Sequence, residues 1–154
     1  MVQLGFYKGN CPVYKLISWW TKSPYSHVCF IKNNMKIEAV FSGVRKTKID
    51  DFCGKWECDV YDIKDLTQEQ SDAIWKLALS KVGCHYDFMG IASIVFRFIK
   101  QSVTRYFCSE LVDGIIRDAT GIRLVDASPS RTTPGMLSQS KLINGPVKTI
   151  KSNK

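Results

Sequence analysis

The chain has 154 residues, of which 45% are apolar and 23% are charged, a balance that excludes an intrinsically disordered protein. This length suits one domain with a single core, so we expect one domain over residues 1–154. The net charge of +8 is spread along the chain without a stripe of stacking aromatics, which argues against specific nucleic-acid binding. This spread positive charge is consistent with attraction to an anionic cell-wall polymer, with attraction to anionic lipid, or with solubility alone.

The start of the chain lacks the basic-then-apolar order of a secretory signal. Its longest apolar stretch, residues 88–99, is interrupted by Arg97 and is shorter than the roughly 20 residues that span a membrane. We therefore expect a cytoplasmic protein, with peripheral membrane contact and association with a host or virion left open.

Alternating apolar residues predict strands over residues 3–7, 25–31, 36–41, 44–49, 56–63 and 147–150. Residues 13–20 suit a short helix or an irregular apolar segment. A longer helix is predicted from Thr67, where Thr67 and Gln70 form a capping box, to a stop at Gly83. A further helix begins at about Cys108 and stops at Gly121, and residues 128–137 read as irregular. The predicted fold class is α+β, with a mainly antiparallel sheet packed against helices.

The pair Asn33-Asn34 separates two of these strands and favours a two-residue hairpin. In that register Cys29 faces Glu38, so His27, Cys29 and Glu38 share one face, with Glu38 diagonal to His27 at about 7 Å. A loop longer by one residue would move Glu38 to the other face.

Cys108, His27 and Glu38 are the candidate catalytic residues. A thiol at the start of a helix and beside an imidazole is easily ionised, and a carboxylate would hold the imidazole. Backbone N–H groups at the helix start could stabilise an oxyanion. Each residue also has a structural interpretation: a small buried cysteine, a satisfied histidine and a solvated glutamate. Cys29 is a rival nucleophile in mid-strand, and His85 reads as a loop residue.

The six cysteines fit reduced thiols in a chain of this size better than disulfides. A zinc site from Cys53, Cys58, Cys84 and His85 is an alternative, although the Cys53–Cys58 spacing is loose for a zinc half-site. We predict no metal and no cofactor.

Several segments resemble the circularly permuted branch of the NlpC-type papain-like hydrolases, which includes YiiX-type bacterial hydrolases and the lecithin:retinol acyltransferase group. They are residues 21–28, 37–39 with 43–44, 82–83 with 86–88, 106–112 and 128–137. The resemblance implies a permuted papain-like fold, with Cys108 as nucleophile, His27 as base and Glu38 as third polar residue. Tyr86 and Asp87 match a recurrent pair with a structural or substrate-positioning role, and Tyr25 is a further candidate for substrate binding. Cys29 stands where relatives commonly have a small residue.

Three functions follow as hypotheses. The first is a cysteine amidase or peptidase that acts through an acyl-enzyme, with peptidoglycan peptide amides as the expected substrate. The second is a lipid acyltransferase or phospholipase-like thiol enzyme, which would use residues 88–99 at a membrane surface; core packing or a lid over the site are the alternative roles of these residues. The third is a catalytically inert binding protein. The substrate would be a peptide or acyl compound, a cell-wall fragment or a lipid, and the oligomeric state is open.

Overall fold

The structure is a computed structural model that describes residues 1–9, 15, 18–19, 22–40, 42–51, 55–84, 104–127 and 132–152, without the side chains of 104–107. Its strands are β1 (Gln3–Gly9), β2 (His27–Lys32), β3 (Met35–Val40), β4 (Gly43–Lys48), β5 (Trp56–Ile63) and β6 (Ile143–Lys151). Its helices are α2 (Gln68–Ser80), α4 (Thr104–Thr120) and α5 (Pro134–Ser138).

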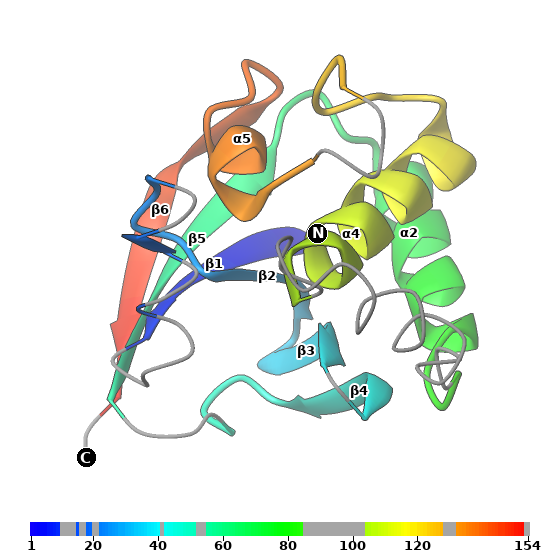
Figure 1. The fold of residues 1–154 in the computed structure, drawn as a ribbon. Helices are drawn as coiled ribbons and strands as arrows, with labels where there is room; N and C mark the ends of the chain where they lie inside the picture. The colour runs from blue at the N-terminus through cyan, green and yellow to red at the C-terminus, as the bar shows by residue number, and fades with distance from the viewer. Residues whose placement is uncertain are drawn as a thin grey trace, which may run out of the picture.

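The six strands form one antiparallel sheet in the order β4-β3-β2-β1-β5-β6. Figure 1 shows α2 and α4 side by side against the sheet, and α5 also packs against α4. This arrangement confirms the predicted α+β class. Most strands lie where alternation predicted them, and β6 begins four residues before the predicted start.

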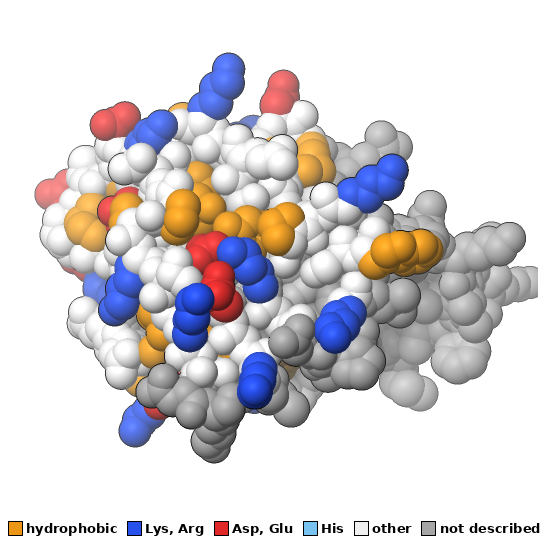
Figure 2. All heavy atoms as spheres, turned by 90° about the vertical axis from the view of Figure 1, so that its left-hand side faces the viewer, with side chains coloured by type: hydrophobic (Ala, Val, Ile, Leu, Met, Phe, Trp, Pro, Cys, Tyr) orange, Lys and Arg blue, Asp and Glu red, His pale blue; other side chains and the backbone are white. Residues whose placement is uncertain are grey.

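Strand β6 forms one edge of the sheet, and most of its residues are exposed. Lysines and Pro146 on this strand discourage edge-to-edge pairing with other chains. Lys151 pairs with Glu57 at 3.1 Å, and Lys8 pairs with Asp59 at 2.7 Å. Figure 2 shows this side of the molecule, where basic side chains are scattered among acidic and apolar ones rather than gathered in one patch.

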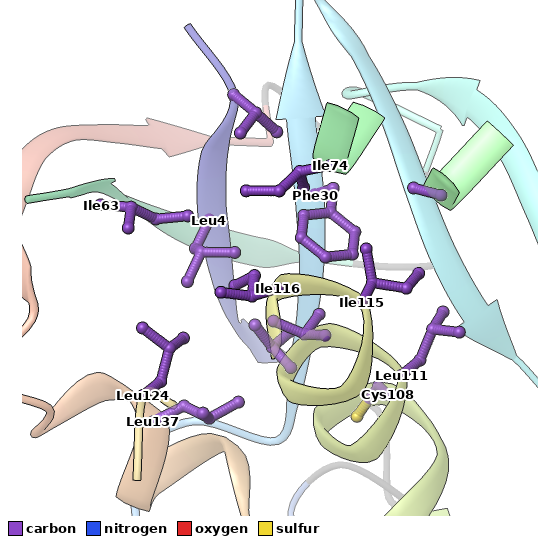
Figure 3. Close-up of a cluster of buried hydrophobic side chains, with 14 of the residues drawn as sticks. Leu4, Phe30, Ile63, Ile74, Cys108, Leu111, Ile115, Ile116, Leu124 and Leu137 are labelled. Carbon is purple, nitrogen blue, oxygen red and sulfur yellow. The ribbon is translucent and has the colours of Figure 1, made fainter. Parts of the chain in front are cut away.

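The main core lies between the sheet and the helices, because one face of each central strand carries apolar side chains. Leu4 of β1 and Phe30 of β2 are fully buried there, and Figure 3 shows Ile115 and Ile116 of α4 next to them. A smaller apolar cluster covers the opposite face and consists of Tyr7, Cys29, Ile31, Ile49, Trp56, Cys58 and Val60.

Helix α2 confirms the predicted capping box. The Thr67 side chain accepts from the Gln70 N–H at 3.1 Å, and the Gln70 side chain accepts from the Thr67 N–H at 3.0 Å. The helix ends at Ser80, before the predicted stop, and Gly83 then takes a φ of +85° in the following turn. Val82 consequently lies outside the helix and is exposed.

Two predictions around the other helices were wrong. Helix α4 begins at Thr104, four residues before Cys108. Residues 104–107 can extend the helix because they contain no glycine or proline. The tail predicted as irregular contains α5, because Thr133 caps it by accepting from the Met136 N–H at 3.2 Å and Pro134 suits a first helical position. Most of the segment 13–20, predicted as a short helix or an irregular apolar segment, lies outside the described residues.

Candidate active site

The β2–β3 hairpin brings His27 and Glu38 together. Lys32 pairs with Met35 across a two-residue loop, as predicted, and Asn33 and Asn34 adopt left-handed φ angles of 51° and 60°. Nε2 of His27 lies 2.9 Å from Oε2 of Glu38, and both side chains are buried. The predicted diagonal pair therefore meets directly.

Glu38 is surrounded by cations. Its Oε1 lies 3.0 Å from Nζ of Lys36 and 2.8 Å from Nη2 of Arg45, whose Nε also donates to it at 2.9 Å. Burial raises the pKa of this carboxyl group, but the hydrogen bond and charge of His27 and the ammonium of Lys36 outweigh burial and lower the pKa to about 2. Glu38 is therefore ionised at neutral pH.

Cys108 lies at the other side of His27, in the second turn of α4 and 3% exposed. Burial raises the pKa of its thiol, but the charge of His27 and the hydrogen bond with it outweigh this effect, so the pKa is lowered overall. The backbone N–H groups of Val28 and Ser109 donate to the sulfur and act in the same direction. The prediction that the helix begins at about Cys108 was wrong. The pKa of this thiol is lowered chiefly by the imidazole of His27.

His27 has the complementary shift. Burial lowers the pKa of its imidazole, but the charge and hydrogen bond of Cys108, followed by those of Glu38, raise the pKa to about 9. Because Glu38 occupies Nε2, Nδ1 is the ring nitrogen left for the thiol. The site can therefore hold a thiolate beside an imidazolium, which is the state a nucleophilic cysteine needs.

Cys29, the rival nucleophile, has the opposite electrostatics. It is fully buried in the smaller cluster, and burial, together with the nearby Cys58 and Glu38, raises the pKa of its thiol well above the ordinary value. A neutral thiol is a poor nucleophile, so the directions of the two pKa shifts favour Cys108 over Cys29.

Tyr25, a predicted substrate-binding residue, is 8% exposed. Its hydroxyl donates to Oδ2 of Asp59 at 2.8 Å and lies 3.0 Å from the Tyr61 hydroxyl. These contacts tie the segment that precedes His27 to β5. Substrate binding by Tyr25 stays a prediction, and Tyr86, Asp87, His85 and residues 88–99 lie outside the described residues.

Three polar residues near the site escaped the sequence reasoning. Lys36 could have been found, since it shares a face with Glu38 two residues away in β3. Arg45 required the β3–β4 register, in which it pairs with Glu38. Ser109 required tertiary contact, because its buried hydroxyl donates to the Thr132 carbonyl at 2.6 Å and ties α4 to the segment before α5.

The zinc alternative finds no support among the described residues. Cys58 is buried, with burial raising the pKa of its thiol to about 12, whereas Cys84 is exposed, and Cys53 and His85 lie outside the description. No group of three or more possible metal ligands occurs in the part of the chain that the structure describes.

Two further expectations concern the redox state of the cysteines and the presence of a membrane-spanning segment. Within the described ranges Cys29, Cys58, Cys84 and Cys108 are free thiols. Among those same residues, no helix combines the length and apolar character needed to cross a membrane.

Comparison with known proteins places this chain in a family. A family model described as permuted papain-like amidase enzyme, YaeF/YiiX, C92 family, matches residues 13–141. The crystal structure of the metalloprotein YiiX from Escherichia coli O157:H7 has the same fold, with a TM-score of 0.61 and 20% sequence identity over 96% of this chain and 94% of that one. No curated protein sequence matches significantly. The chain belongs to the YaeF/YiiX (C92) family of permuted papain-like amidases.

Proposed function

We propose that this protein is a cysteine amidase in which Cys108 is the nucleophile, His27 the general acid and base, and Glu38 the residue that orients His27. The observation that carries the proposal is the chain of contacts through the imidazole. One side of the ring meets Glu38 at 2.9 Å, and the other side meets a thiol whose pKa is lowered. Membership in an amidase family supports an amide as the bond attacked.

The first half of the reaction would proceed as follows. The Cys108 thiolate attacks the amide carbonyl carbon, and the carbonyl electron pair moves to its oxygen. When the C–N bond breaks, the imidazolium of His27 gives its proton to the leaving amine. The product is an acyl-enzyme, a thioester on Cys108, with His27 neutral.

In the second half, neutral His27 takes a proton from water as the water oxygen attacks the thioester carbon. The C–S bond then breaks, the carboxylic acid leaves, and the thiolate–imidazolium pair returns. One amide and one water thus become one acid and one amine. Glu38 stays ionised throughout and keeps the imidazole in the orientation that both proton transfers need.

For the substrate, the proposal is an amide in peptidoglycan peptides. The net charge of +8 suits an anionic cell-wall polymer, because opposite charge raises its concentration near the protein. Thiol chemistry on a lipid ester at a membrane is the competing outcome of the substrate test. A catalytically inert binding protein is the other outcome.

The test compares Cys108→Ala with Cys84→Ala, a matched removal of an exposed thiol. Peptidoglycan fragments and lipid esters are each supplied, and mass spectrometry follows both the products and any acyl adduct. We expect wild type and Cys84→Ala to cleave the peptide amides, and Cys108→Ala to lose on the order of 10³-fold or more of that rate. Full activity of folded Cys108→Ala would end the proposal, and an adduct formed only from lipid esters would replace amidase with lipid chemistry.

A further inference from the structure

The two oxygens of Glu38 have separate partners. Oε2 faces Nε2 of His27, whereas Oε1 receives Lys36 at 3.0 Å and Arg45 at 2.8 Å. A carboxylate held by one hydrogen bond can rotate about its last side-chain bond. Cations on the second oxygen remove that freedom, because rotation would break both ion pairs.

Lys36 is fully buried, which is an expensive position for an ammonium group. Its Nζ lies 5.2 Å from the centroid of the Tyr7 ring, so an aromatic face lies near it as well as Glu38. An apolar side chain of similar length would fill the same space without the cost of desolvation. Fold stability alone therefore gives a weak reason for a lysine here.

Arg45 reaches the same oxygen from the neighbouring strand β4. Its side chain is 42% exposed, whereas that of Lys36 has no exposure. The carboxylate is thus held by one cation from within the protein and one from its surface. The exposed guanidinium is more strongly screened by solvent, so the buried ammonium is the stronger electrostatic partner.

We infer that Lys36 and Arg45 are positioning residues that hold Glu38 ionised and aimed at His27, and so maintain the nucleophilic thiolate of Cys108. This inference rests on the proposed function and adds to it two cationic side chains that support Glu38. The chain of contacts runs from Lys36 and Arg45 through Glu38 and His27 to the sulfur.

The other titratable groups around this cluster come from four elements. Tyr7 of β1, Cys29 of β2 and Cys58 of β5 have thiol or phenol pKa values raised chiefly by burial, so they are neutral near pH 7. His27 of β2 and Cys108 of α4 are the groups whose pKa values change when a cation beside Glu38 is removed. Removing a cation makes proton binding to the thiolate easier, and a loosened Glu38 holds the imidazolium less well, so both effects raise the pKa of Cys108.

The experiment measures iodoacetamide alkylation of Cys108 against pH in the full-length protein, with peptide mass spectrometry to separate it from the other cysteines. The variants are Lys36→Met and Arg45→Met. The matched control is Lys46→Met, an exposed lysine opposite Ile37 on the sheet. We expect the alkylation profile to move to higher pH by about one unit in both variants and to stay unchanged in the control. Arg45→Lys, which keeps the positive charge, should retain most of the wild-type alkylation profile.

The outcomes separate this inference from the proposed function. If wild-type Cys108 titrates like the exposed Cys84, the thiolate–imidazolium pair and the proposed function both fail. If wild-type Cys108 is activated but folded Lys36→Met and Arg45→Met retain its profile, only the positioning role is overturned. If Lys36→Met does not fold, the Arg45→Met variant provides the test, because the Arg45 side chain is partly exposed. An alkylation profile of Arg45→Met that does not shift contradicts the inference.

Discussion

Nε2 of His27 lies 2.9 Å from Oε2 of Glu38, although the two residues are eleven positions apart and lie on neighbouring strands. The contact depends on the Asn33-Asn34 loop, which fixes the register of β2 against β3. It leaves one ring nitrogen for Cys108 and ties the electrostatics of the thiol to a carboxylate on another strand.

His27→Ala should slow alkylation of Cys108 by iodoacetamide at pH 7. The imidazolium charge and hydrogen bond lower the pKa of this thiol against the effect of burial, so their removal leaves a neutral buried thiol. A rise of one pKa unit removes about tenfold of the thiolate, so we expect at least that loss of rate. Cys84 in the same sample is the control for reagent and access. An unchanged ratio of Cys108 to Cys84 alkylation would contradict the prediction.

Acid should destabilise the protein through Glu38. Its pKa is lowered from 4.5 to about 2 in the folded state, so its contribution to stability is fully present above about pH 4.5 and is lost as pH falls through 2. The shift corresponds to on the order of 3 kcal/mol. Thermal melts from pH 5.5 to 2.5 should therefore fall more steeply for wild type than for Lys36→Met/Glu38→Gln, which removes the buried pair together.

Asp51→Asn, at an exposed carboxylate, is the control for that series and should follow the wild-type slope. Parallel slopes for wild type and the double variant would show that Glu38 does not govern acid unfolding.

Asn34→Ala should lower stability, whereas Asn34→Gly should preserve or increase it. Asn34 has a φ of 60°, where an alanine costs about 1 kcal/mol and a glycine has no steric penalty. Urea unfolding of both variants measures the difference. Because Asn34 is exposed and outside the site, both should cleave substrate like wild type when folded. Equal stability of the two variants would remove turn geometry as the factor that fixes this register.

Tyr25→Phe should lower the free energy of unfolding by about 1 kcal/mol while leaving KM nearly unchanged. The lost hydroxyl donates to Asp59, which keeps Lys8 and Thr149 as partners at 2.7 Å each. Tyr61→Phe, which removes the neighbouring hydroxyl, is the matched comparison. A large rise in KM for Tyr25→Phe without loss of stability would instead assign that hydroxyl to substrate binding.

The sequence by itself determined the features that depend on neighbouring residues. Two asparagines tolerate left-handed φ angles and set the hairpin, and alternation then places His27 and Glu38 on one face. The capping box at Thr67 is equally local, and it was predicted with the correct partners. The segments that resemble the permuted papain-like hydrolases pointed to Cys108 as the nucleophile, and the matching family model covers all of these segments.

Only the tertiary structure decided how the site is charged. Helix α4 brings Cys108 to His27 and shows that the thiol lies one turn inside the helix, so its lowered pKa comes chiefly from the imidazole. Arg45 meets Lys36 on one oxygen of Glu38 because the β3–β4 register pairs Arg45 with Glu38, whereas Lys36 reaches that oxygen from two residues away on β3. A pKa depends on burial and on every charge within a few ångströms, and these are set by contacts between distant segments rather than by the spacing of residues along the chain.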